Sequence, residues 1–373
     1  MNFFLMCISC GECFLLSFIL FSHPLRQNQA ANRWLACFIF IMGTAFLGIS
    51  LSNRIEIYHL RVFIGWMNSL QFLLSPFLFL SILFFVEPVK VFSKRDILHF
   101  IPFIAFVSLQ AFVLSAKRDL MTVTLFEAGN FVFFIRDLLP FQFIGYIIVS
   151  YFLLIRHKIN LKWIIASDKG ITLDWLRHFL VILAVLVVFW INDGIFGEPT
   201  LLTAMPIIYT ASVFFLSYYA IRQGTVFVFE KKDLEAVSQI METPIKQQAP
   251  KVSRLSMEQL NAYAQKLDHL MIEEKLYLDN KLNLTMLADR IGASVHDTSF
   301  LVNTLKGENF YAFINQWRVE EAKRLLRTGK MDKLNMNGIA FGSGFNSKTA
   351  FNMAFKKYAG CSPSGYIKQL KLE

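Results

Sequence analysis

Seven stretches of about twenty mostly apolar residues occupy the first 221 positions of this chain. Several of them, including Val62–Val86 and Leu201–Ile221, contain no charged residue. A helix of about 20 apolar residues is long enough to cross the hydrocarbon core of a bilayer. The other stretches are Phe3–Phe21, Trp34–Ser52, Ile97–Ser115, Leu138–Ile155 and Phe179–Phe196. Residues 1–221 are therefore predicted to form a seven-helix transmembrane bundle.

The composition changes after this region. The whole chain is 55% hydrophobic and holds 40 Phe, more than a soluble domain usually carries, and the excess lies in the first 220 residues. Residues 222–256 are polar, contain Pro244 and Pro250, and lose the apolar period, which is typical of a linker. Residues 257–373 have an ordinary soluble mixture. The predicted fold class is thus all-α, with a membrane domain, a linker and a soluble helical domain.

Lys and Arg residues between the apolar stretches predict the orientation, because short cytoplasmic loops carry the excess of positive charge. With the N-terminus outside, the inner loops 23–33, 87–96 and 156–178 carry ten Lys and Arg, and the outer loops carry five. The linker and the soluble domain would then lie in the cytoplasm, attached to the cytoplasmic membrane.

Polar residues at membrane depth are candidates for a functional site. Asn192 and Asp193 lie near the outer end of the sixth stretch, beside Trp190. One interpretation is a helix end that reaches the membrane surface. The other is a sensor pocket that opens outward, with Asp193 facing a polar or cationic effector whose identity the sequence does not give.

No set of residues in the chain indicates catalysis. Cys7, Cys10 and Cys13 are spaced by three, but they lie in an apolar stretch without a nearby His, so we expect them to pack rather than to bind a metal. The sequence shows no phosphate-binding loop, kinase motif or nucleophile triad. We therefore expect no enzyme activity and no cofactor.

The soluble part is basic. Residues 251–373 carry 18 Lys and Arg against 12 Asp and Glu, whereas residues 1–250 carry 19 against 15. The smaller part therefore holds the larger excess, which suits a nucleic-acid partner because neutralising phosphates supplies affinity for any sequence.

Two segments of the soluble part have the pattern of a helix, a tight turn and a second helix. In residues 284–306, Thr285 is predicted to cap a helix whose inner face holds Leu287, Ala288 and Ile291, and Gly292 suits the turn. The pattern returns in residues 336–358. There Ile339, Ala340 and Gly344 take the matching positions, and the second helix would bury Ala350, Phe351 and Phe355.

A long helix is predicted between the two segments, over Phe310–Thr328. Its apolar residues have helical spacing and are predicted to point inward, whereas its basic residues are predicted to lie outside. The predicted inner residues are Phe313, Ile314, Trp317, Val319, Ala322, Leu325 and Leu326, and the predicted outer residues are Arg318, Lys323, Arg324 and Arg327.

Residues 276–369 resemble the DNA-binding domain of the AraC/XylS family of bacterial transcriptional regulators. The resemblance is carried by the run Trp317–Leu326 and by residues on either side of it, namely Phe310, Ile339, Ala340, Gly344, Phe345, Phe351, Phe355, Lys356, Lys357, Gly360, Ser362, Pro363 and Tyr366. It implies two helix-turn-helix units whose second helices enter successive major-groove segments of double-stranded DNA. The residues that it implies as DNA contacts are His296, Asp297, Ser299 and Asn303 in the first unit, and Ser347, Lys348, Thr349 and Asn352 in the second.

Further polar residues beside these are predicted to contact base edges or phosphates, namely Asn346, Lys356 and Lys357. Thr298 stands where the first recognition helix usually has an apolar residue, so the first unit is expected to contribute positioning more than base readout.

The sequence thus predicts a membrane-anchored, sequence-specific DNA-binding regulator, with an unidentified effector and a second copy of the chain as further candidate partners. A transporter or membrane enzyme with a basic protein-interaction module is the alternative, as is a sensor whose DNA-binding domain has lost its role.

Overall fold

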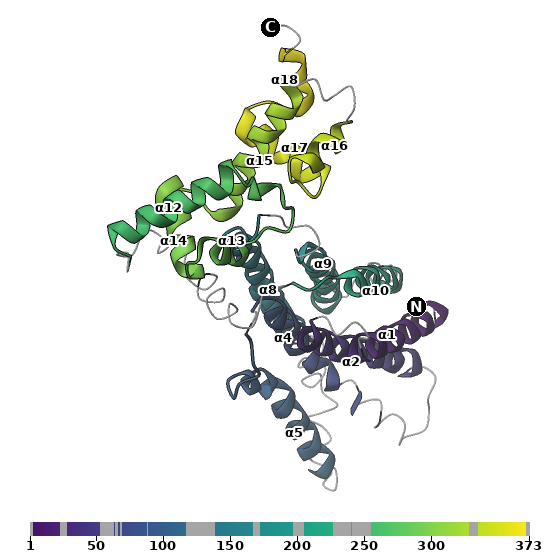
Figure 1. The fold of residues 1–373 in the computed structure, drawn as a ribbon. Helices are drawn as coiled ribbons and strands as arrows, with labels where there is room; N and C mark the ends of the chain where they lie inside the picture. Colours follow the sequence, from purple (N-terminus) through teal and green to yellow (C-terminus); the bar gives the residue numbers. More distant parts are fainter. Residues whose placement is uncertain are drawn as a thin grey trace. The chain divides into compact units, whose positions relative to one another are not determined.

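The computed structural model describes most of the chain as helices. The described residues are 3–22, 28–52, 63, 66–67, 69–87, 89–116, 139–166, 172–196, 205–226, 240, 255–327 and 335–370. Their regular elements are all helical, as predicted, and one isolated β-bridge joins Ile165 and Asn283. The chain divides into two compact units (Figure 1), which are described separately. The first unit is Met1–Ile155 with Leu173–Val226, and the second is Arg156–Thr172 with Phe227–Glu373.

The first unit is built from apolar helices. They are α1 (Phe3–Ser22), α2 (Gln29–Ser52), α4 (Leu74–Val86) after the 3-10 turn η1 (Leu70–Leu73), α5 (Ile101–Ala116) after η2 (Asp96–Phe100), most of α8 (Leu139–Leu161), α9 (Asp174–Phe196) and α10 (Met205–Arg222). Four helical segments among the described residues are long and apolar enough to cross a membrane: Phe4–Ser22, Gln29–Leu51, Leu139–Leu161 and Asp174–Asn192. Shorter apolar helices cover Leu70–Val86, Asp96–Phe112 and Ile207–Arg222.

Each of the seven predicted stretches overlaps one of these helices. Residues 53–62 and 201–204, at the edges of two predicted stretches, lie outside the described residues, as does most of the predicted linker 222–256. The structure thus supports an apolar helical N-terminal region.

Small and hydroxyl-bearing residues hold the helices of the first unit together. The Ser17 hydroxyl of α1 donates a 2.9 Å hydrogen bond to the Ala36 carbonyl of α2. The Ser81 hydroxyl of α4 donates one of 3.0 Å to the Ala31 carbonyl. At Gly43 of α2, a Cβ atom would lie only 3.0 Å from the ring of Phe14. Close approach at small residues, with hydroxyls bonding across helices, is typical of packing in apolar surroundings.

The second unit contains eight further helical elements in its described part. They are α12 (Met257–Ile272), η6 (Leu276–Leu278), α13 (Leu284–Ile291), α14 (Val295–Lys306), α15 (Phe310–Arg327), α16 (Met336–Gly342), α17 (Lys348–Ala359) and α18 (Pro363–Leu370). In Figure 1, α15 lies between the group formed by α12, α13 and α14 and the group formed by α16, α17 and α18.

Two hydrophobic cores lie along α15. The first contains Phe310, Phe313 and Ile314 from its N-terminal half, together with residues of α12, α13 and α14. The second contains Val319, Ala322, Leu325 and Leu326 from its C-terminal half, together with residues of α16 and α17. The predicted long helix thus connects two separately packed helix groups.

Helix α12 starts at Met257, with a capping box between Ser256 and Gln259. The predicted loop 156–178 is divided between the two units, since Arg156–Thr172 belongs to the second. Residues 161–166 contribute to the first core. No local sequence pattern predicts this contribution.

Candidate nucleic-acid interface

The first helix pair consists of α13 and α14, joined by the turn 292–294. Gly292 has a φ of +76°, a conformation that glycine adopts without strain. Its amide donates to the Ala288 carbonyl at 2.9 Å and so ends α13. The N-cap of α13 is Asn283 rather than the predicted Thr285, since the Asn283 side chain accepts from the Met286 amide at 2.9 Å. Thr285 supports this cap by donating its hydroxyl to Asn283 at 2.7 Å.

The predicted contact residues of α14 lie on one side of the helix. Val295, Thr298, Leu301 and Val302 are buried on the opposite side. At about 100° per residue, His296, Ser299 and Asn303 fall within a narrow sector. His296 is exposed, while the other two are half-buried. The structure therefore brings together three of the four residues predicted in the first unit.

Two neighbours of these residues have local structural roles. Thr298 is completely buried, and its hydroxyl donates to the Ser294 carbonyl at 2.9 Å, so a polar residue fills this core position with its hydrogen bond made. The Asp297 carboxylate accepts from the Ser294 hydroxyl at 2.6 Å, at the start of α14. The Asp297 side chain thus contributes to the helix cap.

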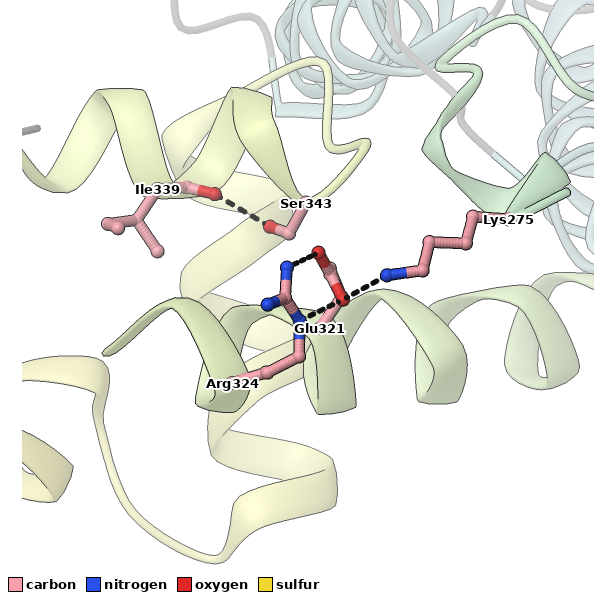
Figure 2. A network of polar contacts seen from close by, with 5 residues as sticks. All are labelled: Lys275, Glu321, Arg324, Ile339 and Ser343. Carbon is pink, nitrogen blue, oxygen red and sulfur yellow. Dashed lines mark hydrogen bonds and ion pairs between the residues drawn. The ribbon is translucent and has the colours of Figure 1, made fainter. Parts of the chain in front are cut away.

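The second helix pair consists of α16 and α17, joined by the turn 343–347. Gly344 has a φ of +89°. Ser343 is completely buried, and its hydroxyl donates to the Ile339 carbonyl at 2.7 Å (Figure 2). Asn346 and Ser347 are half-buried, and the Ser347 side chain caps α17 by accepting from the Ala350 amide at 3.2 Å. These contacts fix the direction in which α17 leaves the turn.

The exposed side of α17 holds most of the predicted contact residues. Phe351, Ala354 and Phe355 are buried in the second core, and Ala350 is half-buried. The exposed residues of this helix include five of the predicted contacts and one apolar side chain, namely Lys348, Thr349, Asn352, Lys356, Lys357 and Met353.

The exposed residues of α17 do not all share one direction. Thr349, Asn352 and Lys356 fall within about 60° of one another around the helix axis, so they form the centre of the exposed side. Lys348 and Lys357 are nine positions apart and point about 180° apart, at opposite edges. Lys357 also donates to the Tyr358 hydroxyl at 3.0 Å. The centre of the side therefore offers an amide, a hydroxyl and an ammonium group together.

Met353 is a candidate that the sequence interpretation missed. It is 60% exposed, beside Thr349 and Asn352 on the same side of α17. An exposed apolar side chain there can contact the methyl group of thymine in the major groove. Its position four residues after Thr349 was the available signal, since residues four apart in a helix share a face.

A polar network lies at the middle of α15. The Glu321 carboxylate accepts two hydrogen bonds from Arg324, at 2.8 and 2.6 Å, and lies 3.6 Å from the Lys275 ammonium (Figure 2). These bonds from Arg324, followed in effect by the charge of Lys275, hold the pKa of Glu321 below its usual value. The network connects α15 to the residue that precedes η6.

We expect Glu321→Gln to lower the stability of the second core at pH 7 by about 1–2 kcal/mol. Because the pKa of Glu321 is lower in the folded state, its contribution is present at neutral pH and is lost as pH falls through that folded pKa. The variant should therefore lose less stability than the wild type between pH 7 and pH 3. Urea titrations at the two pH values, read by protection of α15 and α17 amides, measure this.

Glu320→Gln is the matched control. Glu320 is 65% exposed in its side chain and pairs only with Lys323 among the described residues, whereas the Glu321 side chain is 6% exposed. The control should change stability by less than about 0.5 kcal/mol. An identical acid response of the wild type and Glu321→Gln would contradict the assignment.

The predicted sensor residues lie near the end of α9. Trp190 packs against a small cluster of Phe72, Phe106 and Leu139. Asn192 is half-buried, and the side chain of Asp193 lies outside the described residues. The packing of Trp190 is what a structural role requires, and a pocket at Asp193 stays a prediction.

The described residues contain no group of three His, Cys, Asp or Glu that could hold a metal ion. Comparison with known proteins gives one match. Residues 287–369 match the family described as "Helix-turn-helix domain", which is of the AraC type. No curated protein and no solved structure matches the chain. The match covers both helix pairs and the helix between them, and it supports a DNA-binding domain of a transcriptional regulator.

Proposed function

We propose that this chain is a membrane-anchored regulator that binds specific DNA sequences through α14 and α17. The observation that carries the proposal is the exposed side of α17, where Thr349, Asn352 and Lys356 lie together opposite a buried apolar side. The helix-turn-helix match over residues 287–369 supports the same role. The helix pairs α13–α14 and α16–α17 are then the two helix-turn-helix units.

The two helices are proposed to contribute differently. On α17, Asn352 can form two hydrogen bonds with adenine, and Lys356 can neutralise a phosphate. On α14, His296, Ser299 and Asn303 offer fewer charges and two of them are half-buried. The first unit is therefore proposed to position the domain on DNA, while the second reads the bases.

Anchoring in the cytoplasmic membrane is supported by two further observations. The first unit contains helices long and apolar enough to cross a bilayer, and large apolar side chains such as Phe18 are 71% exposed. The residues 161–166 pack in one core with α12–α15, so the segment between α8 and α9 lies on the same side of a membrane as the DNA-binding domain. This agrees with the loop charges, which favour the cytoplasmic side for both.

We expect Asn352→Ala to weaken binding to a preferred sequence by about 1–3 kcal/mol and to reduce discrimination at one base position. Lys356→Ala should weaken binding to all sequences alike and lower the slope of log K against log salt by about one. The measurement uses the full chain in lipid nanodiscs and a duplex from the promoter region next to its own gene, compared with scrambled duplexes across a salt series.

Lys281→Ala is the control for loss of one positive charge, since Lys281 is exposed in the turn before α13 and belongs to neither α14 nor α17. It should leave the discrimination unchanged. Equal affinity of the wild-type chain for promoter and scrambled duplexes would remove the proposed function and favour a protein-interaction module or a domain that no longer binds DNA.

The sensing role is proposed for the outer end of α9, where Asn192 and Asp193 are the only polar pair in a run of apolar residues. If Asp193 faces a cationic effector, Asp193→Asn should abolish the effect of that effector on DNA affinity and leave DNA affinity in its absence unchanged. A screen of cationic metabolites by this assay tests it, with Asn192→Asp as the companion variant. A full response of the Asp193→Asn variant to the effector would exclude a sensing role for Asp193.

A further inference from the structure

A short segment from between two apolar helices forms part of the DNA-binding domain's first core. Leu161 is the last residue of α8, and the chain continues through Ile164, Ile165 and Ala166. All four are buried, and they belong to the same cluster as residues of α12, α13 and α15. Leu282, a buried residue of the same cluster in the turn before α13, lies more than 110 positions further along the sequence. The first core is therefore incomplete without residues 161–166.

Backbone hydrogen bonds fix this segment at two helix starts. The Leu284 amide, at the first position of α13, donates to the Ile164 carbonyl at 2.8 Å. The Tyr311 amide, in the first turn of α15, donates to the Lys162 carbonyl at 3.0 Å. Amides in the first turn of a helix have no acceptor within that helix. The segment thus supplies acceptors to both helices that flank α14.

Two buried side chains of α15 also bond to the end of the segment. Arg318 donates to the Ala166 carbonyl at 3.2 Å, and Asn315 donates to the same oxygen at 3.4 Å. Ile165 in addition forms the β-bridge with Asn283, which is the N-cap of α13. The contacts are spread over every residue from Leu161 to Ala166 except Trp163, which packs on the core partly buried. Core packing and hydrogen bonds thus hold the segment together.

We propose that residues 161–166 are a clip that completes the first helix-turn-helix unit, and that the membrane domain regulates DNA binding by seating or withdrawing the clip. The proposal rests on the proposed function. The clip follows directly on α8, a continuous helix over Leu139–Leu161 whose first residues belong to the first unit. A displacement of α8 would therefore reach the clip through the continuous backbone.

The two helix-turn-helix units depend on the clip to different extents. Withdrawal removes the acceptors of the Leu284 and Tyr311 amides and opens the first core around Ile164, so α13 and α15 no longer hold α14 in place. The second core contains no residue of the clip. Withdrawal therefore leaves α17 folded and affects α14 selectively, which converts a reader with two recognition helices into one with a single recognition helix.

The test uses the full chain in nanodiscs and follows hydrogen exchange at the amides of Leu284 and Tyr311. Both should be protected in the wild type. Ile164→Asp should expose them, leave the amides of α17 protected and weaken binding to the promoter duplex by on the order of tenfold or more. Lys162→Ala is the matched control, because its side chain is exposed while its carbonyl stays in place. It should behave as the wild type in both measurements.

A second measurement covers the case in which Ile164→Asp unfolds both cores. In a background without the native cysteines, Ile165→Cys and Asn283→Cys stand opposite each other at the β-bridge, where Cα atoms are about 4.5–5.5 Å apart and a disulfide can close. Rapid and complete cross-linking in nanodiscs is expected, with full promoter binding in the cross-linked chain. Reduction of the disulfide should then restore any change in promoter binding that the membrane domain imposes.

Three results separate the possible failures. Fast exchange at Leu284 and Tyr311 in the wild type, or failure of the cysteine pair to cross-link, would show that the clip is not seated. Wild-type DNA affinity of Ile164→Asp with both amides exposed would show that the clip does not govern DNA binding. Absence of promoter binding by the wild type with both amides protected would overturn the proposed function and leave the clip's seating established.

Discussion

Gly344→Ala is expected to unfold the second helix pair locally. The glycine has a φ of +89°, which an alanine adopts only at a cost of about 1–2 kcal/mol. A Cβ atom there would also collide with the Tyr277 carbonyl oxygen and lie 2.9 Å from the Leu278 Cα. Both are backbone atoms of η6, so no side chain can rotate away. Together the two effects should lower the free energy of local unfolding by at least about 3 kcal/mol.

The measurement is native-state hydrogen exchange of the α17 amides in the full chain, because a chain with two compact units has no single free energy of unfolding. Gly360→Ala is the matched control. Gly360 also has a positive φ, of +76°, but nothing lies within 4 Å of its Cβ position. Gly360→Ala should lower the stability only by the cost of the positive φ, about 1–2 kcal/mol. Equal losses in the two variants would mean that the turn at Gly344 moves away from η6 without penalty.

A consequence for DNA binding follows from the same geometry. The contact between Gly344 and η6 sets the turn from which α17 leaves, so the alanine variant should lose discrimination between promoter and scrambled duplexes together with α17 protection. Gly360 follows the end of α17 and should affect discrimination much less.

Local patterns in the sequence predicted much of this domain. Leu287, Ala288 and Ile291 are buried, as are Ile339 and Ala340, and the turns contain Gly292 and Gly344 as expected. These features depend on residues within one or two helical turns of each other. Helical spacing and glycine conformation record such short-range requirements directly in the sequence.

The position of Arg318 was predicted wrongly. It was assigned to the outer side of α15 with the other basic residues, but it is completely buried. The helical period contained the correct signal, since Ile314 and Ala322 lie four residues before and after it and both are buried. Spacing, rather than charge, thus decides on which side of α15 this residue lies. The partners that make burial possible lie in other parts of the chain, one of them 152 residues away, and local patterns do not reveal them.

The clip illustrates the same limit. Residues 161–166 follow an apolar stretch and carry ordinary loop charges nearby, so they were interpreted as part of a membrane loop. Their role depends on the Leu284 and Tyr311 amides, more than 110 positions further on. On α17, by contrast, the exposed contact residues were predictable from the sequence. The placement of Lys348 and Lys357 at opposite edges depends on knowing which side of the helix faces the core, and the buried Phe351 and Phe355 define that side.

Arg318→Ala is expected to be among the most damaging substitutions in the DNA-binding domain. The guanidinium donates to the carbonyls of Tyr277, Asp279 and Ala166, at 2.8, 2.8 and 3.2 Å. Burial lowers its pKa to about 10, so it stays charged at neutral pH. It joins α15 to η6 and to the clip at once. Removing it leaves a cavity and unmade hydrogen bonds, with an expected loss of about 3–5 kcal/mol.

The three carbonyls differ in the hydrogen bonds that they keep after Arg318 is replaced. The Asp279 carbonyl keeps the Leu282 amide at 3.2 Å, and the Ala166 carbonyl keeps Asn315 at 3.4 Å. The Tyr277 carbonyl has no other hydrogen-bond donor among the described residues. Arg318→Met should therefore recover part of the loss seen in the alanine variant, because both variants remove the buried charge but only methionine refills the volume. The difference between the alanine and methionine variants measures packing, and the remainder measures the hydrogen bonds.

Arg318→Lys tests whether the charge or its geometry matters. An ammonium group keeps the desolvation penalty but cannot reach carbonyls in three directions as the planar guanidinium does, so the lysine variant should be no more stable than the methionine variant. Exposed Arg327, which the sequence placed with Arg318, serves as the control, and Arg327→Met should cost less than about 1 kcal/mol. Hydrogen exchange at Leu284 and Tyr311 reads the first core in each variant, and a lysine variant with wild-type protection would show that charge alone suffices at this position.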